Sequence, residues 1–299
     1  MSRIDGFLLV DKPKTWTSHD VVAKVRGIAG QKKVGHAGTL DPMATGLLVL
    51  ALGRATRLLR FVQEAPKEYV ATARFGVATD TLDADGAVLS REPMAVTEDD
   101  VDAVLGRFTG RILQVPPMVS ARRVGGRRLY AMARQGVEVE REARPVTIHD
   151  IEVIDFAPCD YPEVTLRVRC STGTYIRTLA DDLAGALGGR AYLTSLRRTA
   201  NGGHRVGSAH TVDALSLAAD EERLTDLVLS PADGLPDLPA VIVDPDTAEG
   251  VRHGVPFASR ALGDGAPGDG VVRLTDGAGG LLAVYTIDGV RAMPEVVLS

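Results

Sequence analysis

A glycine-punctuated loop at residues 35–46, which holds a single carboxylate, constrains this chain more than any other segment. It reads Gly-His-Ala-Gly-Thr-Leu-Asp-Pro-Met-Ala-Thr-Gly and leads directly into an apolar run at residues 47–52. The glycines permit backbone conformations and close approaches that a Cβ would obstruct. Pro42 biases Asp41 toward an extended conformation. The segment predicts a turn-rich loop that presents Asp41 beside an apolar element.

Asp41 has two interpretations at this level. Because Asp-Pro pairs often begin turns, its carboxylate can simply cap the next turn. Alternatively, the loop presents the carboxylate for chemistry, with the imidazole of His36 five residues before it. The local sequence leaves both interpretations open.

Length and composition restrict the class of protein. The 299 residues suffice for one large or two ordinary domains. The only cysteines are Cys159 and Cys170, so neither a disulfide framework nor a zinc site built from CxxC pairs is indicated. The N-terminus lacks the basic and apolar regions of a signal peptide, and residues 47–52 are too few to span a bilayer. We therefore expect a cytoplasmic protein without a membrane segment.

The charge of the chain is unevenly distributed. The net charge is −5, yet residues 1–70, 107–145 and 167–205 carry balances of +5, +6 and +5. Residues 206–299 carry a balance of −10. Basic blocks of this kind can build a phosphate-binding face even on an acidic chain, although a solvated basic face without a ligand is the plainer alternative.

Periodicity predicts strands and helices in alternation over most of the chain. We expect strands at residues 6–13, 69–76 and 164–170, with residues 87–89 as the hairpin partner of the second. Apolar spacing and caps predict helices at residues 18–29, 55–63, 97–108 and 176–187. Residues 81–92 look like part of a calcium loop, but the first ligand position is Thr81 and the flanks look like strands. We therefore expect no metal there.

The amino-acid composition of the chain changes near residue 230, where several prolines lie close together. Beyond them the sequence predicts short strands at residues 240–243, 271–274 and 281–285. The pattern predicts an α+β protein with a larger domain at residues 1–230 and a small β-rich domain at residues 238–299. In the larger domain, residues about 117–147 form an inserted basic arm, with four arginines around the glycine pair at 125–126.

Together these segments resemble the bacterial tRNA pseudouridine-55 synthases over nearly the whole chain. The loop at residues 35–46 is the most specific match, and the shorter motifs follow in the family's order. One departure is Thr15, because the family usually has glycine two residues after the proline of Asp11-Lys12-Pro13. The shorter motifs are Lys67-x-Tyr69, Thr79-Asp80-Thr81-x-Asp83-x-x-Gly86, Tyr130-x-x-Ala133-Arg134-x-Gly136, Gly173-Thr174-Tyr175-Ile176-Arg177 and Leu196-Arg197-Arg198.

The resemblance implies a pseudouridine-synthase-like mixed or antiparallel sheet flanked by helices, with a PUA-like domain at residues 238–299. The implied reaction isomerises a uridine in the T-loop of tRNA, at position 55, and needs neither a cofactor nor a metal. Asp41 would be the catalytic carboxylate, which attacks the ribose, deprotonates it or adds to the base. Arg177 would hold Asp41 ionised, since an opposite charge favours the charged form. Tyr69 would stack on the base and assist proton transfer, and Tyr175 would orient Asp41 or the base, with core packing as the alternative for each.

The same resemblance implies the contacts with RNA. His36 would fill the stack vacated by the flipped base, and Leu196 would press on the uracil, with core packing as its alternative. Asp80 and Arg134 lie in motifs shared with the family. The arm would grip backbone phosphates through Arg122, Arg123, Arg127 and Arg128. The expected partner is the tRNA T-stem-loop, and nothing in the sequence implies an obligate protein partner or an assembly beyond a monomer.

Three other functions remain to be weighed. A guide-RNA-dependent pseudouridine synthase shares the central motifs, but the compact length and the basic arm favour a stand-alone enzyme. A non-catalytic tRNA-folding chaperone would not need the set Asp41, Tyr69 and Arg177. A glycosidase using Asp41 usually needs a second carboxylate, and no matching motif supplies one.

Overall fold

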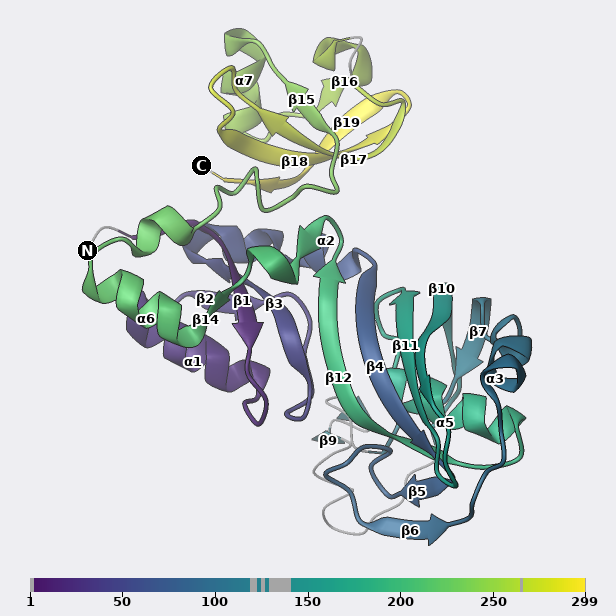
Figure 1. Cartoon of the computed structure of the whole chain (residues 1–299). Helices are drawn as coiled ribbons and strands as arrows, with labels where there is room; N and C mark the ends of the chain where they lie inside the picture. Colours follow the sequence, from purple (N-terminus) through teal and green to yellow (C-terminus); the bar gives the residue numbers. More distant parts are fainter. Residues whose placement is uncertain (1–2, 119–122, 125–126, 129–140, 264–265, 299) are drawn as a thin grey trace.

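The computed structural model describes residues 3–118, 123–124, 127–128, 141–263 and 266–298. Within these ranges the chain forms a ten-stranded mixed sheet, a five-stranded sheet and two two-stranded ribbons (Figure 1). Helices pack on the large sheet, so the α+β class and the mixed sheet expected from the sequence are confirmed. No helix in these ranges is long and apolar enough to cross a membrane.

The N-terminal half of the large sheet is buried on both faces. Along β1, Leu8 and Val10 belong to one hydrophobic cluster and Phe7 and Leu9 to another, because successive side chains of a strand point to opposite faces. Helices α1 and α6 complete the first cluster, and α2 with the C-terminal strands completes the second. The elements of this half are β1 (Gly6–Lys12), β2 (Val34–His36), β3 (Thr45–Leu52), β14 (His210–Thr211), α1 (Ser18–Ile28), η1 (Gly53–Leu58), α2 (Leu59–Glu64) and α6 (Val212–Asp220).

The second half of the sheet is buried mainly on one face. Along β4, every second residue from Tyr69 to Phe75 lies in the main core, while the residues that alternate with them are half-buried or exposed. Helices α3 and α5 close this core face (Figure 1). The elements of this half are β4 (Lys67–Phe75), β7 (Gly110–Gln114), β10 (Arg144–Ala157), β11 (Glu163–Cys170), β12 (Ala191–Asn201), β13 (His204–Arg205), α3 (Glu98–Leu105) and α5 (Ile176–Ala186).

The two halves meet where β3 runs beside β12. The parallel pairing there involves only Arg197 with Thr45 and Arg198 with Gly46. Gly46 has a φ of +98°, and a Cβ on it would lie 2.3 Å from the carbonyl oxygen of Arg198. A glycine is therefore required for the loop at residues 35–46 to enter the sheet at this point.

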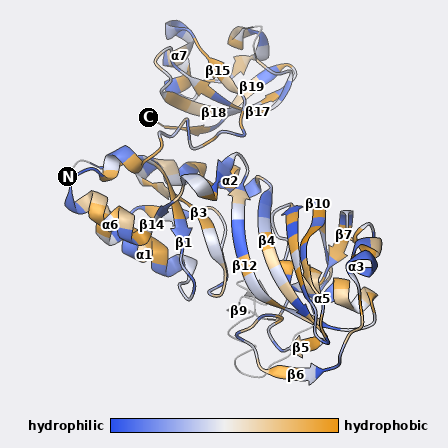
Figure 2. Ribbon diagram, in the orientation of Figure 1, coloured by the Kyte–Doolittle hydropathy of each residue, from blue (hydrophilic) through white to orange (hydrophobic). Residues whose placement is uncertain are grey.

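Helices α1 and α3 begin where capping signals in the sequence place them. Thr17 and Thr97 each accept a hydrogen bond from the backbone of the third helical residue, an aspartate that bonds back to the cap. These capping boxes explain why the starts of α1 and α3 can be predicted from the sequence. Figure 2 shows that α1 and α6 each carry hydrophobic and hydrophilic residues, as expected for helices with one face on a sheet.

Two expectations about local structure are wrong. The segment at residues 87–89 is not the hairpin partner of β4, because β6 (Val88–Arg91) pairs with a separate short strand, β5 (Val77–Thr79). The chain bends at Gly76, whose φ is +80°, so the strand predicted at 69–76 does not continue into that hairpin. The helix predicted at residues 55–63 is divided between the 3-10 turn η1 and α2.

The C-terminal segment expected to be rich in β-strands forms the five-stranded sheet. Its strands contact α2 and the turn before it, since Arg54 and Arg57 donate to the carbonyls of Leu298 and Val297 at 3.0 and 2.6 Å. Arg60 forms an ion pair with Glu295. The elements are β15 (Ala240–Ile242), α7 (Pro245–Arg252), β16 (Phe257–Ala258), η4 (Ser259–Leu262), β17 (Asp269–Thr275), β18 (Leu281–Asp288) and β19 (Arg291–Val297).

Candidate active site

The loop that carries Asp41 is held through its backbone. Ser18, at the start of α1, accepts from the amide of Leu40 at 2.9 Å and donates to its carbonyl at 3.3 Å. The carbonyl of Pro42 accepts from the backbone amide of Thr15 at 2.8 Å. These contacts fix the main chain on both sides of Asp41. The Asp41 side chain is left 34% exposed.

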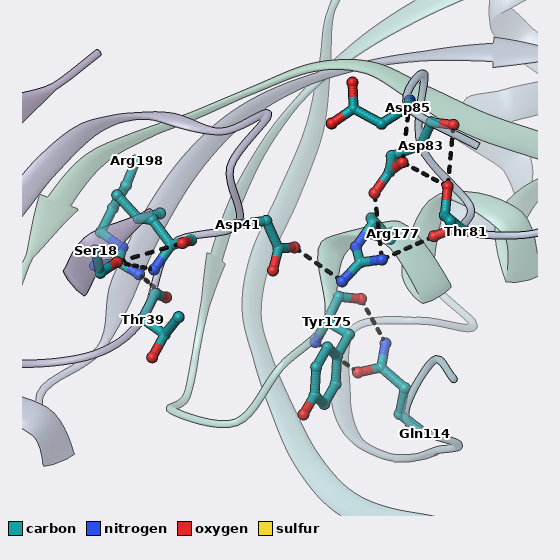
Figure 3. A network of polar contacts seen from close by, with 11 residues as sticks. Ser18, Thr39, Asp41, Thr81, Asp83, Asp85, Gln114, Tyr175, Arg177 and Arg198 are labelled. Carbon is teal, nitrogen blue, oxygen red and sulfur yellow. Dashed lines mark hydrogen bonds and ion pairs between the residues drawn. The ribbon is translucent and has the colours of Figure 1, made fainter. Parts of the chain in front are cut away.

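Asp41 and Arg177 form an ion pair although they lie far apart in the sequence. Nη2 of Arg177 is 2.9 Å from Oδ2 of Asp41 (Figure 3). Arg177 sits in the first turn of α5, and its side chain is only 3% exposed. A charge-assisted contact with a buried guanidinium fixes the direction of the carboxylate. The geometry therefore supplies a fixed, solvent-accessible carboxylate.

A second carboxylate holds Arg177 from the other side. Nη1 of Arg177 lies 3.3 Å from Oδ2 of Asp83 and donates to the carbonyl of Thr81 at 2.8 Å. The hydroxyl of Thr81 and the amide of Asp85 donate to Asp83 at 2.5 and 3.2 Å (Figure 3). Burial raises the pKa of Asp83, although Thr81 and Arg177 act in the opposite direction. Leu82 has a φ of +60°, a strained turn that brings Thr81 and Asp83 to the same guanidinium.

Tyr69 lies in β4 and is almost fully buried. Its hydroxyl accepts a hydrogen bond from Nε of Arg198 at 3.3 Å, and the guanidinium carbon of Arg198 is 5.5 Å from the centre of its ring. Burial raises the pKa of Tyr69, while the neighbouring Arg198 lowers it. The phenol is therefore protonated at neutral pH.

Tyr175 immediately precedes α5, and its backbone is fixed by Gln114. The amide of Tyr175 donates to Oε1 of Gln114 at 2.7 Å, and Nε2 of Gln114 donates to its carbonyl at 3.0 Å (Figure 3). The half-buried Tyr175 also lines a pocket with Arg144, Pro145 and Thr172. Gln114 thus positions the start of α5, from which Arg177 reaches Asp41.

His36 and Leu196 occupy different environments. His36 is half-buried in β2, its ring meets that of His19 edge-on at 5.7 Å, and burial lowers its pKa. Its buried Nδ1 has no hydrogen-bond partner among the described residues. Leu196 is buried in β12 as part of the main core, which agrees with its alternative as a packing residue. The roles expected of these two side chains toward RNA stay predictions.

The remaining residues expected to contact RNA are placed only in part. The carboxylate of Asp80 accepts from the amide of Ala87 at 2.8 Å, so it fixes the turn between β5 and β6. Arg123, Arg127 and Arg128 lie in the ribbon of β8 (Arg123–Val124) and β9 (Arg127–Arg128), and their side chains are outside the described structure. Arg122 and Arg134 lie outside the described residues.

Two buried cations beside the loop were not assigned a role from the sequence. Nζ of the fully buried Lys12 donates to the carbonyls of Pro13, Trp16 and Pro42 at 2.9, 2.6 and 3.4 Å. Burial lowers the pKa of Lys12 to about 8. Arg198, also buried, donates to the loop and to Tyr69. Both occur in short motifs of the sequence, but only the fold shows that they point inward.

Comparisons with known proteins decide the family. The family model described as "TruB family pseudouridylate synthase (N terminal domain)" matches residues 26–176. The chain is 45% identical over 272 residues to "tRNA pseudouridine synthase B" of Azoarcus sp., covering 91% of this chain and 87% of that protein. It is 43% identical over 300 residues to the protein of the same name from Burkholderia mallei, covering 99% and 98%.

This chain belongs to the TruB family of pseudouridylate synthases. It is therefore a pseudouridine synthase, an isomerase. Solved structures agree with this family. The TruB-family chain is similar to a chain of the "Crystal Structure of a Cbf5-Nop10-Gar1 Complex", with a TM-score of 0.76 and 27% identity over 98% of this chain and 85% of that one. A chain of an "H/ACA RNP bound to a substrate RNA containing 2'-deoxyuridine" gives a TM-score of 0.74 at 26% identity, with 98% and 85% covered.

Proposed function

We propose that this enzyme isomerises a uridine in the T-loop of tRNA, at position 55, to pseudouridine. The relatives that it matches over nearly their full length carry the name tRNA pseudouridine synthase B. In this reaction the bond from N1 of uracil to C1′ breaks, the base turns, and C5 bonds to C1′. C5 loses a proton and N1 gains one, so no redox partner or group donor is needed.

The observation that carries the proposal is the ion pair of Asp41 with the buried Arg177 at 2.9 Å. Asp41 would act on the ribose or the base of the flipped nucleotide as nucleophile or base. Each of these roles requires an ionised carboxylate, which Arg177 stabilises. Tyr69 would stack on the uracil, and Tyr175 would orient the base or Asp41.

Access to the uridine requires that it leave its stack, at a cost of a few kcal/mol. Two groups would offset this cost. His36 would enter the vacated position, and the arm arginines would bind phosphates.

We further propose residues 1–230 as the catalytic unit, with an arm at about 117–147, and residues 238–299 as a small PUA-like unit. Residues 238–299 hold four Lys/Arg against eight Asp/Glu, and this balance of −4 argues against strong phosphate binding by the second unit.

A guide-RNA-dependent synthase is the second candidate, because the similar structures include a ribonucleoprotein bound to substrate RNA. The test is to incubate the purified protein with an unmodified tRNA transcript and map pseudouridine by carbodiimide-dependent primer extension. We expect one new stop in the T-loop, at position 55, and none with Asp41→Asn, which still binds the transcript. Modification only after addition of a guide RNA would favour the second candidate, and Asp41→Asn turnover within about tenfold of wild type would reject Asp41 as the catalytic carboxylate.

A further inference from the structure

Arg198 occupies the only place where the two halves of the large sheet join, among the strands that the structure describes. In β12 it lies opposite Tyr69 of the antiparallel strand β4 and beside Gly46 of the parallel strand β3. Directly opposed residues of neighbouring strands share a face of the sheet. The Arg198 side chain is therefore directed to the same face as Tyr69, toward the loop that carries Asp41.

All the hydrogen bonds found for Arg198 link these two parts of the site. Nη2 donates to the carbonyl of Thr39 at 2.9 Å, and Nη1 lies 3.3 Å from the carbonyls of Gly38 and Leu47. Nε donates to the hydroxyl of Tyr69 at 3.3 Å. Thr39 is two residues before Asp41, so one guanidinium spans the catalytic loop and the tyrosine expected to meet the base.

The charge of Arg198 is not neutralised by an ion pair. The residue is only 2% exposed, and no carboxylate in the described part of the chain lies within 4.0 Å of its nitrogens. Burial of a charge without a counter-ion is unfavourable, and an apolar side chain often serves the core as well or better. Core stability alone is therefore a poor explanation for an arginine at this position.

We propose that Arg198 is a positioning residue for the isomerisation, which rests on the function proposed above. It fixes the distance between the Asp41 loop and Tyr69, and it sets the direction of the Tyr69 hydroxyl. Because that oxygen accepts from Nε of Arg198, its own proton is available to another acceptor. Within the described residues the Tyr69 hydroxyl donates no hydrogen bond. The proton is thus left for the substrate, where the hydroxyl can donate to the base or relay a proton.

The matched variants are Arg198→Met, Arg198→Lys, Tyr69→Phe and the double variant Arg198→Met/Tyr69→Phe. Each is assayed for single-turnover conversion of a tRNA transcript and, separately, for tRNA affinity. We expect Arg198→Met to lower the single-turnover rate by about 100-fold, the cost expected when reacting groups are misplaced by about 1 Å. The affinity stays within about threefold of wild type, because no contact with RNA is removed. Arg198→Lys keeps the charge and recovers part of the rate.

The double variant separates positioning from general stability. If Arg198 acts through the Tyr69 hydroxyl, the double variant is at most about threefold slower than the slower single variant, since both remove the same interaction. Losses that multiply would overturn the proposal, as would an Arg198→Met rate within about threefold of wild type. Circular dichroism checks folding, and where Arg198→Met does not fold, Arg198→Lys with Tyr69→Phe replaces it in the cycle.

Arg197→Met is the control on the same strand. Arg197 is partly exposed and forms two hydrogen bonds with Asp11, at 3.0 and 2.7 Å. We expect this variant to keep the wild-type single-turnover rate. An equal loss in both arginine variants would assign the effect to the sheet junction and reject the role of Arg198. Failure of the wild-type protein to convert any uridine would instead reject the proposed function.

Discussion

Asp83 lies 3.3 Å from Arg177, on the side of the guanidinium away from Asp41. The arginine that contacts the Asp41 carboxylate is thus itself held by a buried carboxylate. We predict that Asp83→Asn slows single-turnover conversion by about tenfold or more, because a neutral amide fixes the guanidinium less firmly. tRNA affinity should remain unchanged, which a filter-binding titration checks.

Asp85→Asn is the matched control for that variant. Asp85 lies two residues away and is exposed, and only its backbone amide contacts Asp83. Its conversion rate should equal that of wild type. A wild-type rate in Asp83→Asn would show that the charge of Asp83 is not needed to orient Arg177.

The entry of the loop at residues 35–46 into the sheet predicts an unusual sensitivity at Gly46. Gly46→Ala places a Cβ 2.3 Å from the Arg198 carbonyl at a φ of +98°. We expect a loss of about 3 kcal/mol or more in the free energy of unfolding, as the sum of backbone strain and overpacking. Urea denaturation measures this loss of stability.

Gly185→Ala is the control for Gly46→Ala, because Gly185 is an exposed helical residue whose Cβ would contact nothing within 4 Å. It should stabilise the protein by about 0.5–1 kcal/mol.

Thr15 has a strained backbone conformation. The φ of Thr15 is +74°, which a β-branched residue rarely adopts. Its backbone amide donates a hydrogen bond to the carbonyl of Pro42. Thr15→Gly should therefore stabilise the protein by about 1 kcal/mol, since the released strain exceeds the added entropy of the unfolded chain. The thermal midpoint should rise. Thr15→Ala keeps a Cβ and should gain less, and a destabilised Thr15→Gly would refute the strain.

The sequence predicts the parts of this fold whose signals are local. Thr17 and Thr97 cap their helices through residues three positions away, so both helix starts are recognisable. No strand is predicted from the sequence at β12, because its two adjacent arginines conceal the alternation, and only the motif at residues 196–198 marks this segment. Arg198 can be buried there because it donates to carbonyls at residues 38–47 and to the hydroxyl of Tyr69. These acceptors are distant in the sequence, so no local signal predicts the burial.

The candidate site shows the same division. The glycines and Asp-Pro pair mark the loop of Asp41, but nothing local to residue 83 indicates that its carboxylate meets Arg177. That contact depends on the left-handed turn at Leu82 and on the position of α5. The resemblance supplied Asp41 and Arg177, whereas the support from Asp83, Gln114, Lys12 and Arg198 required the fold.

Lys67 gives a prediction for the dependence of stability on pH. Its Nζ is buried and donates to the carbonyls of Gln63 and Ala65, and burial lowers its pKa from 10.5 to about 8. Between about pH 8 and 10.5 the unfolded chain therefore binds a proton that the folded protein has lost. Stability from this group must rise with pH across that window, by up to about 1.4 kcal/mol per pH unit, and is constant below it.

The difference between wild type and Lys67→Met removes the contributions of groups that do not interact with Lys67. Lys12, with a pKa lowered to about 8, and Cys170, with a pKa raised to about 11, are present in both proteins. Cys170 acts in the opposite direction, since its thiol loses stability as the pH rises above 9. Urea denaturation at pH 7 to 10 should show wild type gaining about 2 kcal/mol relative to Lys67→Met, nearly all of it above pH 8. Two parallel curves would mean that the amine titrates normally, and that the carbonyls of Gln63 and Ala65 together offset its burial.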